Sequence, residues 1–137
     1  MVHSDIDPTR FATHRFGGRG FGQAYVREHI GGVPLLLVHG WPESKRIWWK
    51  VIEPLAEAGF EVIVPDLRGF GDSDIAPDGV GDVPSHSRDL QALLAELGHD
   101  EVVLCGGDLG GPVVQDMALR FPSLVDRLVL FNSPLPF

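Results

Sequence analysis

The fold is decided by the stretch Val102-Val103-Leu104-Cys105-Gly106-Gly107-Asp108-Leu109-Gly110-Gly111-Pro112. An apolar run ends at two glycines, a single acid follows, and two more glycines and a proline come next. Beyond the proline, apolar residues recur at helical spacing, at Val113, Val114, Met117, Ala118 and Phe121. The pattern predicts a strand, a sharp turn and a helix. Asp108 stands at the apex, where the dipole at a helix N-terminus favours an anion.

Taken alone, this turn has two interpretations. It lifts one reactive carboxylate above a sheet, or it is a plain glycine-rich connection in which Asp108 is solvated or caps the helix. A dinucleotide-binding fingerprint does not fit, because Gly106-x-Asp108 lacks the second glycine and no third glycine falls in step. Motifs elsewhere in the chain are needed to distinguish the reactive carboxylate from the plain connection.

The composition is that of a globular chain, and we expect one domain over residues 1–137, with 44% hydrophobic and 9% aromatic residues. A net charge of −8 argues against a nucleic-acid partner and against an anionic membrane surface. The single cysteine, Cys105, excludes an internal disulfide and a Cys-rich metal site. The sequence shows no leader signal and no membrane-spanning run, so we expect a soluble, cytoplasmic protein without a cofactor or a metal.

Two segments before the central stretch read as strands. Gly17–Gly22 looks like a phosphate loop, but Gln23–Ile30 follows it as a strand, which favours a hairpin turn. Val33–Val38 is a nearly continuous apolar run, as expected for a parallel strand buried on both faces. This second strand runs directly into His39-Gly40-Trp41-Pro42.

Two amphipathic helices are predicted between the strands. The first has apolar residues from Trp48 to Leu55, and Pro54 inside it predicts a kink or two short pieces. The second carries a leucine stripe that ends at Gly98, and Ser85 is expected to cap its start. His86 in its first turn and His99 beyond its end are expected to be solvated surface residues.

A loop rich in aspartate follows the strand predicted at Glu61–Val64. Asp66, Asp72 and Asp74 are conceivable metal ligands, but no further ligands stand at a matching spacing. A turn whose aspartates bond to its own backbone is therefore favoured. The last predicted strand is Arg127–Phe131, and the alternation of strands and helices predicts an α/β fold, a mostly parallel sheet with helices on both faces.

Three motifs in this order resemble those of α/β-hydrolases. Gly106–Gly110 resembles the nucleophile elbow, with Asp where esterases and lipases carry Ser. His39–Pro42 resembles the His-Gly-x-Pro turn of epoxide hydrolases, and Asp66–Ser73 matches the family's Asp-x-Arg-Gly-x-Gly-x-Ser loop. The resemblance implies an α/β-hydrolase fold from about Phe16 to Phe137. It covers only the N-terminal half of the family's pattern, so we expect the chain to be truncated before the cap domain and the last strands.

The resemblance also implies roles for individual residues. Asp108 would be the nucleophile, and the backbone N–H groups of Trp41 and Leu109 would form the oxyanion hole. A second set would be structural near the site: His39, Gly40, Pro42, Gly106, Gly110, Asp66 and Arg68. For His39 the expected role is that of a hydrogen-bonded turn histidine.

An aspartate nucleophile suits a particular chemistry. A carboxylate is already ionised at neutral pH, and it can displace a leaving group from an sp³ carbon to give an ester that water then hydrolyses. The expected partner is therefore a small electrophile, an epoxide or an alkyl halide. The motifs favour an epoxide hydrolase that forms a diol. A haloalkane or haloacetate dehalogenase is the alternative, although such enzymes often carry a ring where Leu109 stands.

The chain departs from the family in its general base. All six histidines precede Asp108, whereas the family's base lies downstream of a cap, and Tyr25 is the only tyrosine, so the cap's tyrosine pair is absent too. We therefore expect a chain that is inactive or limited to a single turnover by itself. The apolar strand Arg127–Phe131 predicts a homodimer or a complementary C-terminal chain. The competing hypothesis is a non-catalytic binding or assembly module that retains the half-fold.

Overall fold

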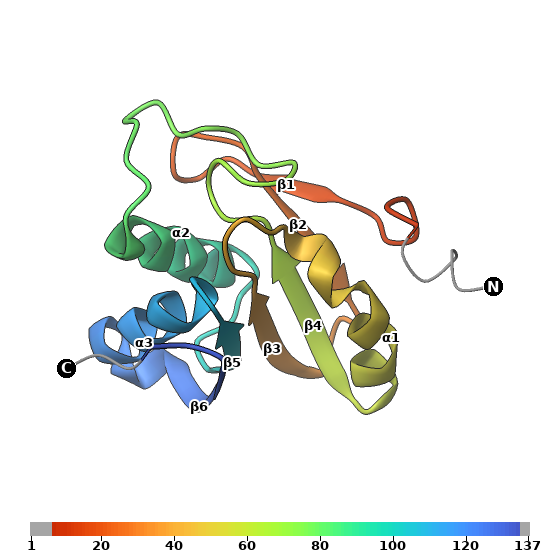
Figure 1. Cartoon of the computed structure of the whole chain (residues 1–137). Helices are drawn as coiled ribbons and strands as arrows, with labels where there is room; N and C mark the ends of the chain where they lie inside the picture. The colour runs from red at the N-terminus through yellow and green to blue at the C-terminus, as the bar shows by residue number, and fades with distance from the viewer. Residues whose placement is uncertain (1–6, 135–137) are drawn as a thin grey trace.

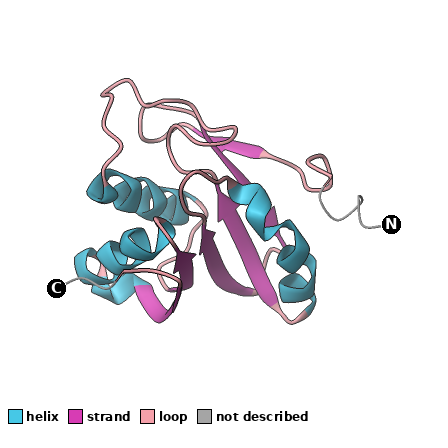
Figure 2. Ribbon diagram, in the orientation of Figure 1, coloured by secondary structure: helices cyan, strands magenta, loops and turns pink. Residues whose placement is uncertain are grey.

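The computed structural model describes residues 7–134, in which one six-stranded sheet lies between helices on its two faces (Figures 1 and 2). The strands are β1 (His14–Phe16), β2 (Gln23–Glu28), β3 (Val33–Val38), β4 (Phe60–Pro65), β5 (Val102–Gly107) and β6 (Val125–Phe131). The helices are α1 (Trp49–Glu57), α2 (Val83–Glu96) and α3 (Gly110–Arg120), with short 3-10 turns η2 (Lys45–Trp48) and η3 (Pro122–Leu124). None of the helices within residues 7–134 combines the length and the apolarity needed to cross a membrane.

The sheet is mostly parallel, as the strand and helix pattern predicts. Its order is β1-β2-β4-β3-β5-β6, in which β4, β3, β5 and β6 run parallel and the β1–β2 hairpin is antiparallel. Gly17–Gly22 connects the two hairpin strands, so the hairpin interpretation of that glycine-rich segment is confirmed.

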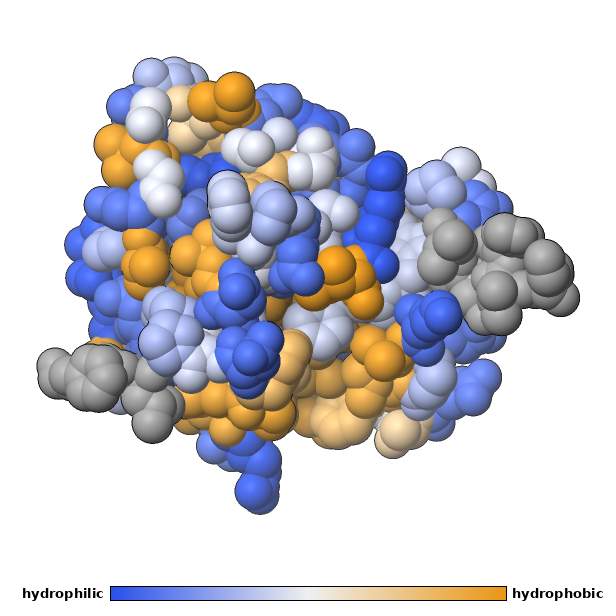
Figure 3. Space-filling view, viewed as in Figure 1, coloured by the Kyte–Doolittle hydropathy of each residue, from blue (hydrophilic) through white to orange (hydrophobic). Residues whose placement is uncertain are grey.

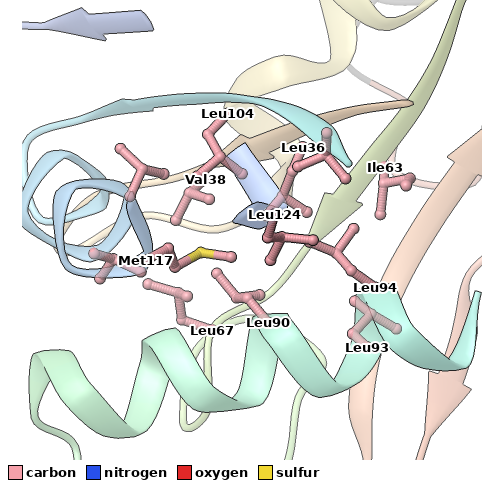
Figure 4. Close-up of a cluster of buried hydrophobic side chains, with 13 residues drawn as sticks. Leu36, Val38, Ile63, Leu67, Leu90, Leu93, Leu94, Leu104, Met117 and Leu124 are labelled. Atoms are coloured by element: carbon pink, nitrogen blue, oxygen red, sulfur yellow. The ribbon is translucent and has the colours of Figure 1, made fainter. Parts of the chain in front are cut away.

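Each central strand is buried on both faces, which explains its continuous apolar sequence. Leu36 and Val38 of β3 pack on one face in the larger core, together with leucines of α2 and Met117 of α3 (Figure 4). Leu35 and Leu37 point to the other face and pack against the tryptophans and Ile52 of η2 and α1.

The register places two loops beside each other at the carboxyl edge of the sheet. Leu37 pairs with Cys105 and Val38 pairs with Gly106, so β3 and β5 end at the same level. The segments that follow them, at residues 39–42 and 107–110, therefore emerge side by side. In open parallel sheets this edge is where ligands bind.

Pro54 was expected to kink the helix or divide it into two pieces, and it does not divide it. Lys45–Trp48 forms a 3-10 turn, and the α-helix then continues through Pro54 to Glu57. Proline removes a helical hydrogen bond and crowds the carbonyl four residues before it, but the packing of Trp49 and Ile52 against the sheet holds the helix together.

Two expectations for α2 were wrong. The helix begins at Val83, and the side chain of Asp82 rather than Ser85 caps it, accepting a hydrogen bond from the Ser85 N–H at 2.9 Å. His86 is not solvated but 1% exposed, because it lies four residues before Leu90 and shares the inward stripe of the helix. Burial lowers the pKa of His86, so its ring is neutral at pH 7.

His99 is not a free surface residue either. Its Nε2 lies 2.6 Å from Oε2 of Glu61. The carboxylate of Glu61 also accepts hydrogen bonds from Arg27 and from the Gly31 N–H. This buried carboxylate joins β2, β4 and the loop before β5 at the end of the sheet opposite the 39–42 segment.

Strand β6 forms one edge of the sheet, and its apolar side chains are partly uncovered. Leu128 is 38% exposed, and Val129 and Phe131 are each 48% exposed. Figure 3 shows hydrophobic colour in the lower part of this face, from the region of β6 toward α1. The edge strand of a sheet carries unpaired backbone N–H and C=O groups, which are in general a template for pairing with another chain.

Candidate active site

Asp108 occupies a strained turn between β5 and α3. Its φ is 53°, in the left-handed region that a residue with a side chain rarely adopts. Glycines allow the close approach on either side: a Cβ at Gly106 would overlap the carbonyl of Gly110, and one at Gly110 would overlap the carbonyl of Val38. The turn therefore holds one exposed carboxylate over the carboxyl edge of the sheet.

The two oxygens of the Asp108 carboxylate have different surroundings. Oδ1 accepts a hydrogen bond from the Trp41 N–H at 2.8 Å and another from the Leu109 N–H at 2.7 Å. Oδ2 accepts none from the residues that the structure describes. The hydrogen bond from Trp41, followed by that from Leu109, lowers the pKa of Asp108 below its ordinary value. The group is thus an anion at neutral pH with one oxygen held and the other free.

The turn after β3 brings Trp41 to this oxygen, and buried His39 holds the turn. The Nδ1 of His39 donates to the carbonyl of Gly40 at 2.8 Å, and its Nε2 accepts from the Leu67 N–H at 3.0 Å. This pair of bonds requires the neutral ring, and burial lowers the pKa of His39 accordingly. Since both ring nitrogens are engaged, His39 has none left for proton transfer.

A second carboxylate, which the sequence analysis missed, lies beside Asp108. Glu43 Oε1 accepts a hydrogen bond from the Gly40 N–H at 2.7 Å. A Cβ built on Gly40 would lie 2.6 Å from that oxygen and 2.7 Å from Asp108 Oδ1, so no larger residue fits at this position. The available signal was an acid directly after Pro42, in a turn that already carried the functional motif.

Asp66 does not contact Asp108. Its carboxylate instead stabilises the aspartate-rich turn that supports the site. Its buried carboxylate accepts from the backbone N–H of Lys45 at 2.8 Å, from Lys45 Nζ at 2.5 Å and from the Asp72 N–H at 2.8 Å. Lys45 is also buried, and its Nζ donates to Asp72 at 2.6 Å. The aspartate-rich turn is therefore organised around a lysine, which the sequence analysis did not single out. Within residues 7–134 no three His, Cys, Asp or Glu side chains are grouped as metal ligands.

Arg68 also stabilises the segments that support the site. Its guanidinium donates to Asp89 of α2 at 2.6 and 2.7 Å and to Asp78 at 3.1 Å. These bonds tie the loop after β4 to α2 and to the segment that precedes it. Arg68 makes no contact with the Asp108 carboxylate.

No histidine hydrogen-bonds Asp108 in the described part of the chain. His39 and His86 are buried, His99 pairs with Glu61, and the ring of His14 packs on Tyr25. The structure thus brings together Asp108, Trp41, Leu109 and Glu43 at one point, and it places Asp66 and Arg68 in the supporting loop.

Comparisons with known proteins agree with this architecture. The family model described as alpha/beta hydrolase fold matches residues 33–137. A soluble epoxide hydrolase of Corynebacterium sp. (strain C12) is 40% identical over 90% of this chain, and the pig bifunctional epoxide hydrolase 2 is 35% identical over 80% of it. A solved structure of an epoxide hydrolase without ligand superposes with a TM-score of 0.85 at 39% identity over 90% of this chain. The chain spans 42%, 20% and 43% of the lengths of these three proteins. It belongs to the α/β-hydrolase fold family.

Proposed function

We propose that Asp108 is the nucleophile of an epoxide hydrolase-like enzyme and that it forms a covalent ester with a small epoxide. The observation that carries the proposal is the asymmetry of its carboxylate. Two backbone N–H groups hold Oδ1, at 2.8 and 2.7 Å, whereas Oδ2 is free among the described residues. The names of the relatives support the choice of an epoxide as substrate.

The two oxygens then have separate roles in the reaction. Oδ2 attacks a ring carbon of the epoxide, the carbon–oxygen bond of the ring breaks, and the released alkoxide takes a proton from water. The ester that forms keeps Oδ1 as its carbonyl oxygen. When water attacks the ester carbon, negative charge develops on Oδ1, where the Trp41 and Leu109 N–H groups are already placed to stabilise it as an oxyanion hole.

The hydrolytic half of the reaction needs a base to take the proton from water. No described histidine offers a nitrogen beside Asp108, and the absence of a positioned base typically slows such a step by about two to four orders of magnitude. We therefore propose that this chain by itself alkylates Asp108 but releases product slowly. Among the described residues, Glu43 is the ionisable side chain beside Asp108 that remains to take the proton from water.

Intact-mass spectrometry tests this function. The chain is incubated with styrene oxide, and the mass of one covalent adduct is expected on wild type and not on Asp108→Asn. An adduct of the same size on both proteins would refute the nucleophile, and sustained diol release by wild type would refute the missing base. No adduct on wild type, with both proteins folded, would favour the non-catalytic module.

The same assay separates the two electrophile classes. Parallel incubation with an alkyl bromide compares dehalogenation with epoxide opening, because both leave an ester on Asp108 and only the former releases halide. We expect faster alkylation by the epoxide, since Leu109 provides no ring N–H or aromatic edge to stabilise a halide.

The exposed edge at β6 supports a further part of the proposal. Its apolar side chains are uncovered, and the relatives are more than twice as long as this chain. We propose that β6 pairs with a second copy of the chain or with a complementary chain. Light scattering that finds only monomer at micromolar concentration would count against self-association.

A further inference from the structure

A second candidate site lies on the face of the sheet that α2 and α3 cover, at the opposite end of α3 from Asp108. A cavity of about 360 Å³ opens there between the β1–β2 hairpin, α2 and the end of α3. It is lined by Arg19, Arg88, Gln91, Ala92, Arg120 and Phe121. Three arginines thus line one cavity in a chain whose net charge is −8.

This lining is unlike that of the other surface cavities. One cavity at the β3 and β5 starts includes Glu101 and Asp126, and another beside α1 includes Glu53 and Glu57. No acidic side chain lines the arginine cavity. Its volume falls within the range of small-molecule sites, about 300–1,000 Å³.

Arg19 is anchored through one nitrogen of its guanidinium, and its two terminal nitrogens are free to bind a ligand. Its Nε donates to buried Asp89 at 3.1 Å, and its two terminal nitrogens have no hydrogen-bond partner among the described residues. Asp89 is already paired with Arg68, which donates to it at 2.6 and 2.7 Å. The charge of Asp89 is therefore shared between two arginines, and Arg19 keeps a net positive charge and a pair of free donors.

The other two arginines add to this charge. Arg120 is anchored to Asp116 through its Nε at 2.9 Å and one terminal nitrogen at 3.0 Å, which leaves its second terminal nitrogen free. Arg88 is exposed and has no hydrogen bond or ion pair within residues 7–134. The hydrogen bonds from Arg120 are the main cause that lowers the pKa of Asp116, and the charge of Arg88 contributes less.

We propose that this cavity binds a phosphate monoester through Arg19, Arg88 and Arg120. Planar guanidinium groups match the oxygens of a phosphoryl group, and charge-assisted hydrogen bonds of this kind are the strong ones. The cavity is larger than a phosphate ion, and Ala92 and Phe121 provide apolar surface for the organic part of the ester. Asp108 takes no part in this binding.

Isothermal titration calorimetry of the full chain tests the site, with inorganic phosphate, phenyl phosphate and phenol as probes. We expect saturable binding of phenyl phosphate that weakens as salt rises. Equal affinity for inorganic phosphate would show that the phosphoryl group alone is recognised, and weaker binding would show that the ester is preferred. Phenol should not bind, and phenol that binds as tightly as phenyl phosphate would overturn the proposal.

Matched variants locate the binding. Arg88→Ala and Arg19→Gln should each weaken the affinity for phenyl phosphate at least about tenfold, since each removes charge-assisted hydrogen bonds. Arg127→Ala removes the same charge from the exposed edge strand and should leave the affinity unchanged, as should Asp108→Asn. Circular dichroism verifies the fold of each variant. An absence of saturable binding by wild type, or equal losses in Arg88→Ala and Arg127→Ala, would refute the site.

Discussion

Replacing Lys45 with methionine should destabilise the fold more than the loss of any exposed ion pair. Methionine keeps most of the apolar stem but removes the ammonium group that bonds Asp66 at 2.5 Å and Asp72 at 2.6 Å. Asp66 is 0% exposed, so its carboxylate would remain buried without a cation. The substitution therefore removes one charge, the Lys45 ammonium, from the ion pairs that support the candidate active site.

The structure sets the size of the effect. Removing one partner of a buried ion pair typically costs about 3–5 kcal/mol, whereas exposed pairs contribute about 0–1 kcal/mol. Asp66 retains hydrogen bonds from the backbone N–H groups of residue 45 and of Asp72, which places the expected loss near the lower limit, at about 3 kcal/mol. For a typical urea dependence, this loss lowers the unfolding midpoint by about 1.5 M.

Urea unfolding followed by circular dichroism measures this loss. The matched control is Arg127→Met, whose guanidinium is 79% exposed and lies 3.9 Å from Asp126, and we expect it to cost less than about 1 kcal/mol. The double variant Lys45→Met/Asp66→Asn should recover part of the loss, because it removes the stranded charge. A loss below about 1 kcal/mol in Lys45→Met, or a double variant no better than the single one, would refute the reasoning.

Three further outcomes are expected. The rate of Asp108 alkylation by styrene oxide should stay constant as pH falls and should decline only below about pH 3.9, because the bonds from Trp41 and Leu109 lower the pKa of the carboxylate; an inflection near pH 6 by quenched mass spectrometry would contradict this. Glu43→Gln should leave the alkylation rate within about twofold but slow the residual ester hydrolysis at least about tenfold, as measured by decay of the adduct. His86→Leu should raise the free energy of unfolding at neutral pH by about 1 kcal/mol, because His86 Nδ1 is buried without a partner. Burial lowers the pKa of His86, so stability is lost as pH falls below about 6.5, and denaturation curves of His86→Leu should show a shallower loss there.

The sequence predicted the sheet because its signals are local. Continuous apolar runs such as Val33–Val38 and Val102–Leu104 require burial on both faces, and only a parallel sheet between helices satisfies that for several strands at once. The turn at Asp108 was also predictable, since glycines on both sides of one acid, between an apolar run and helical spacing, permit the tight turn and the close approach that such a connection needs. The order of the strands within the sheet was not predicted, because it depends on pairing between segments that are distant in the sequence.

What the sequence did not predict depends on contacts between distant segments. Lys45 reads as a surface lysine, and its burial follows only from Asp66, which lies 21 residues away along the chain. His86 likewise reads as polar and solvated, although its position four residues before Leu90 places it on the inward stripe. Glu43 was not singled out, because nothing in its neighbourhood showed that residues 40 and 108 would meet.

The two halves of the proposed chemistry therefore place different demands on the fold. The held oxygen of Asp108 needs only that β3 and β5 are neighbours with their carboxyl ends level, because Trp41 follows one strand and Leu109 follows the other. A base must instead lie beside the water that attacks the ester carbon of Asp108, and there the described residues offer Glu43 and no histidine. Stabilisation of the oxyanion is thus a property of two adjacent strands, whereas turnover requires a group from outside them. A chain of this kind would separate ester formation from ester hydrolysis, and placing a histidine beside the water that attacks the ester carbon, from a second chain or by design, should accelerate only the second step.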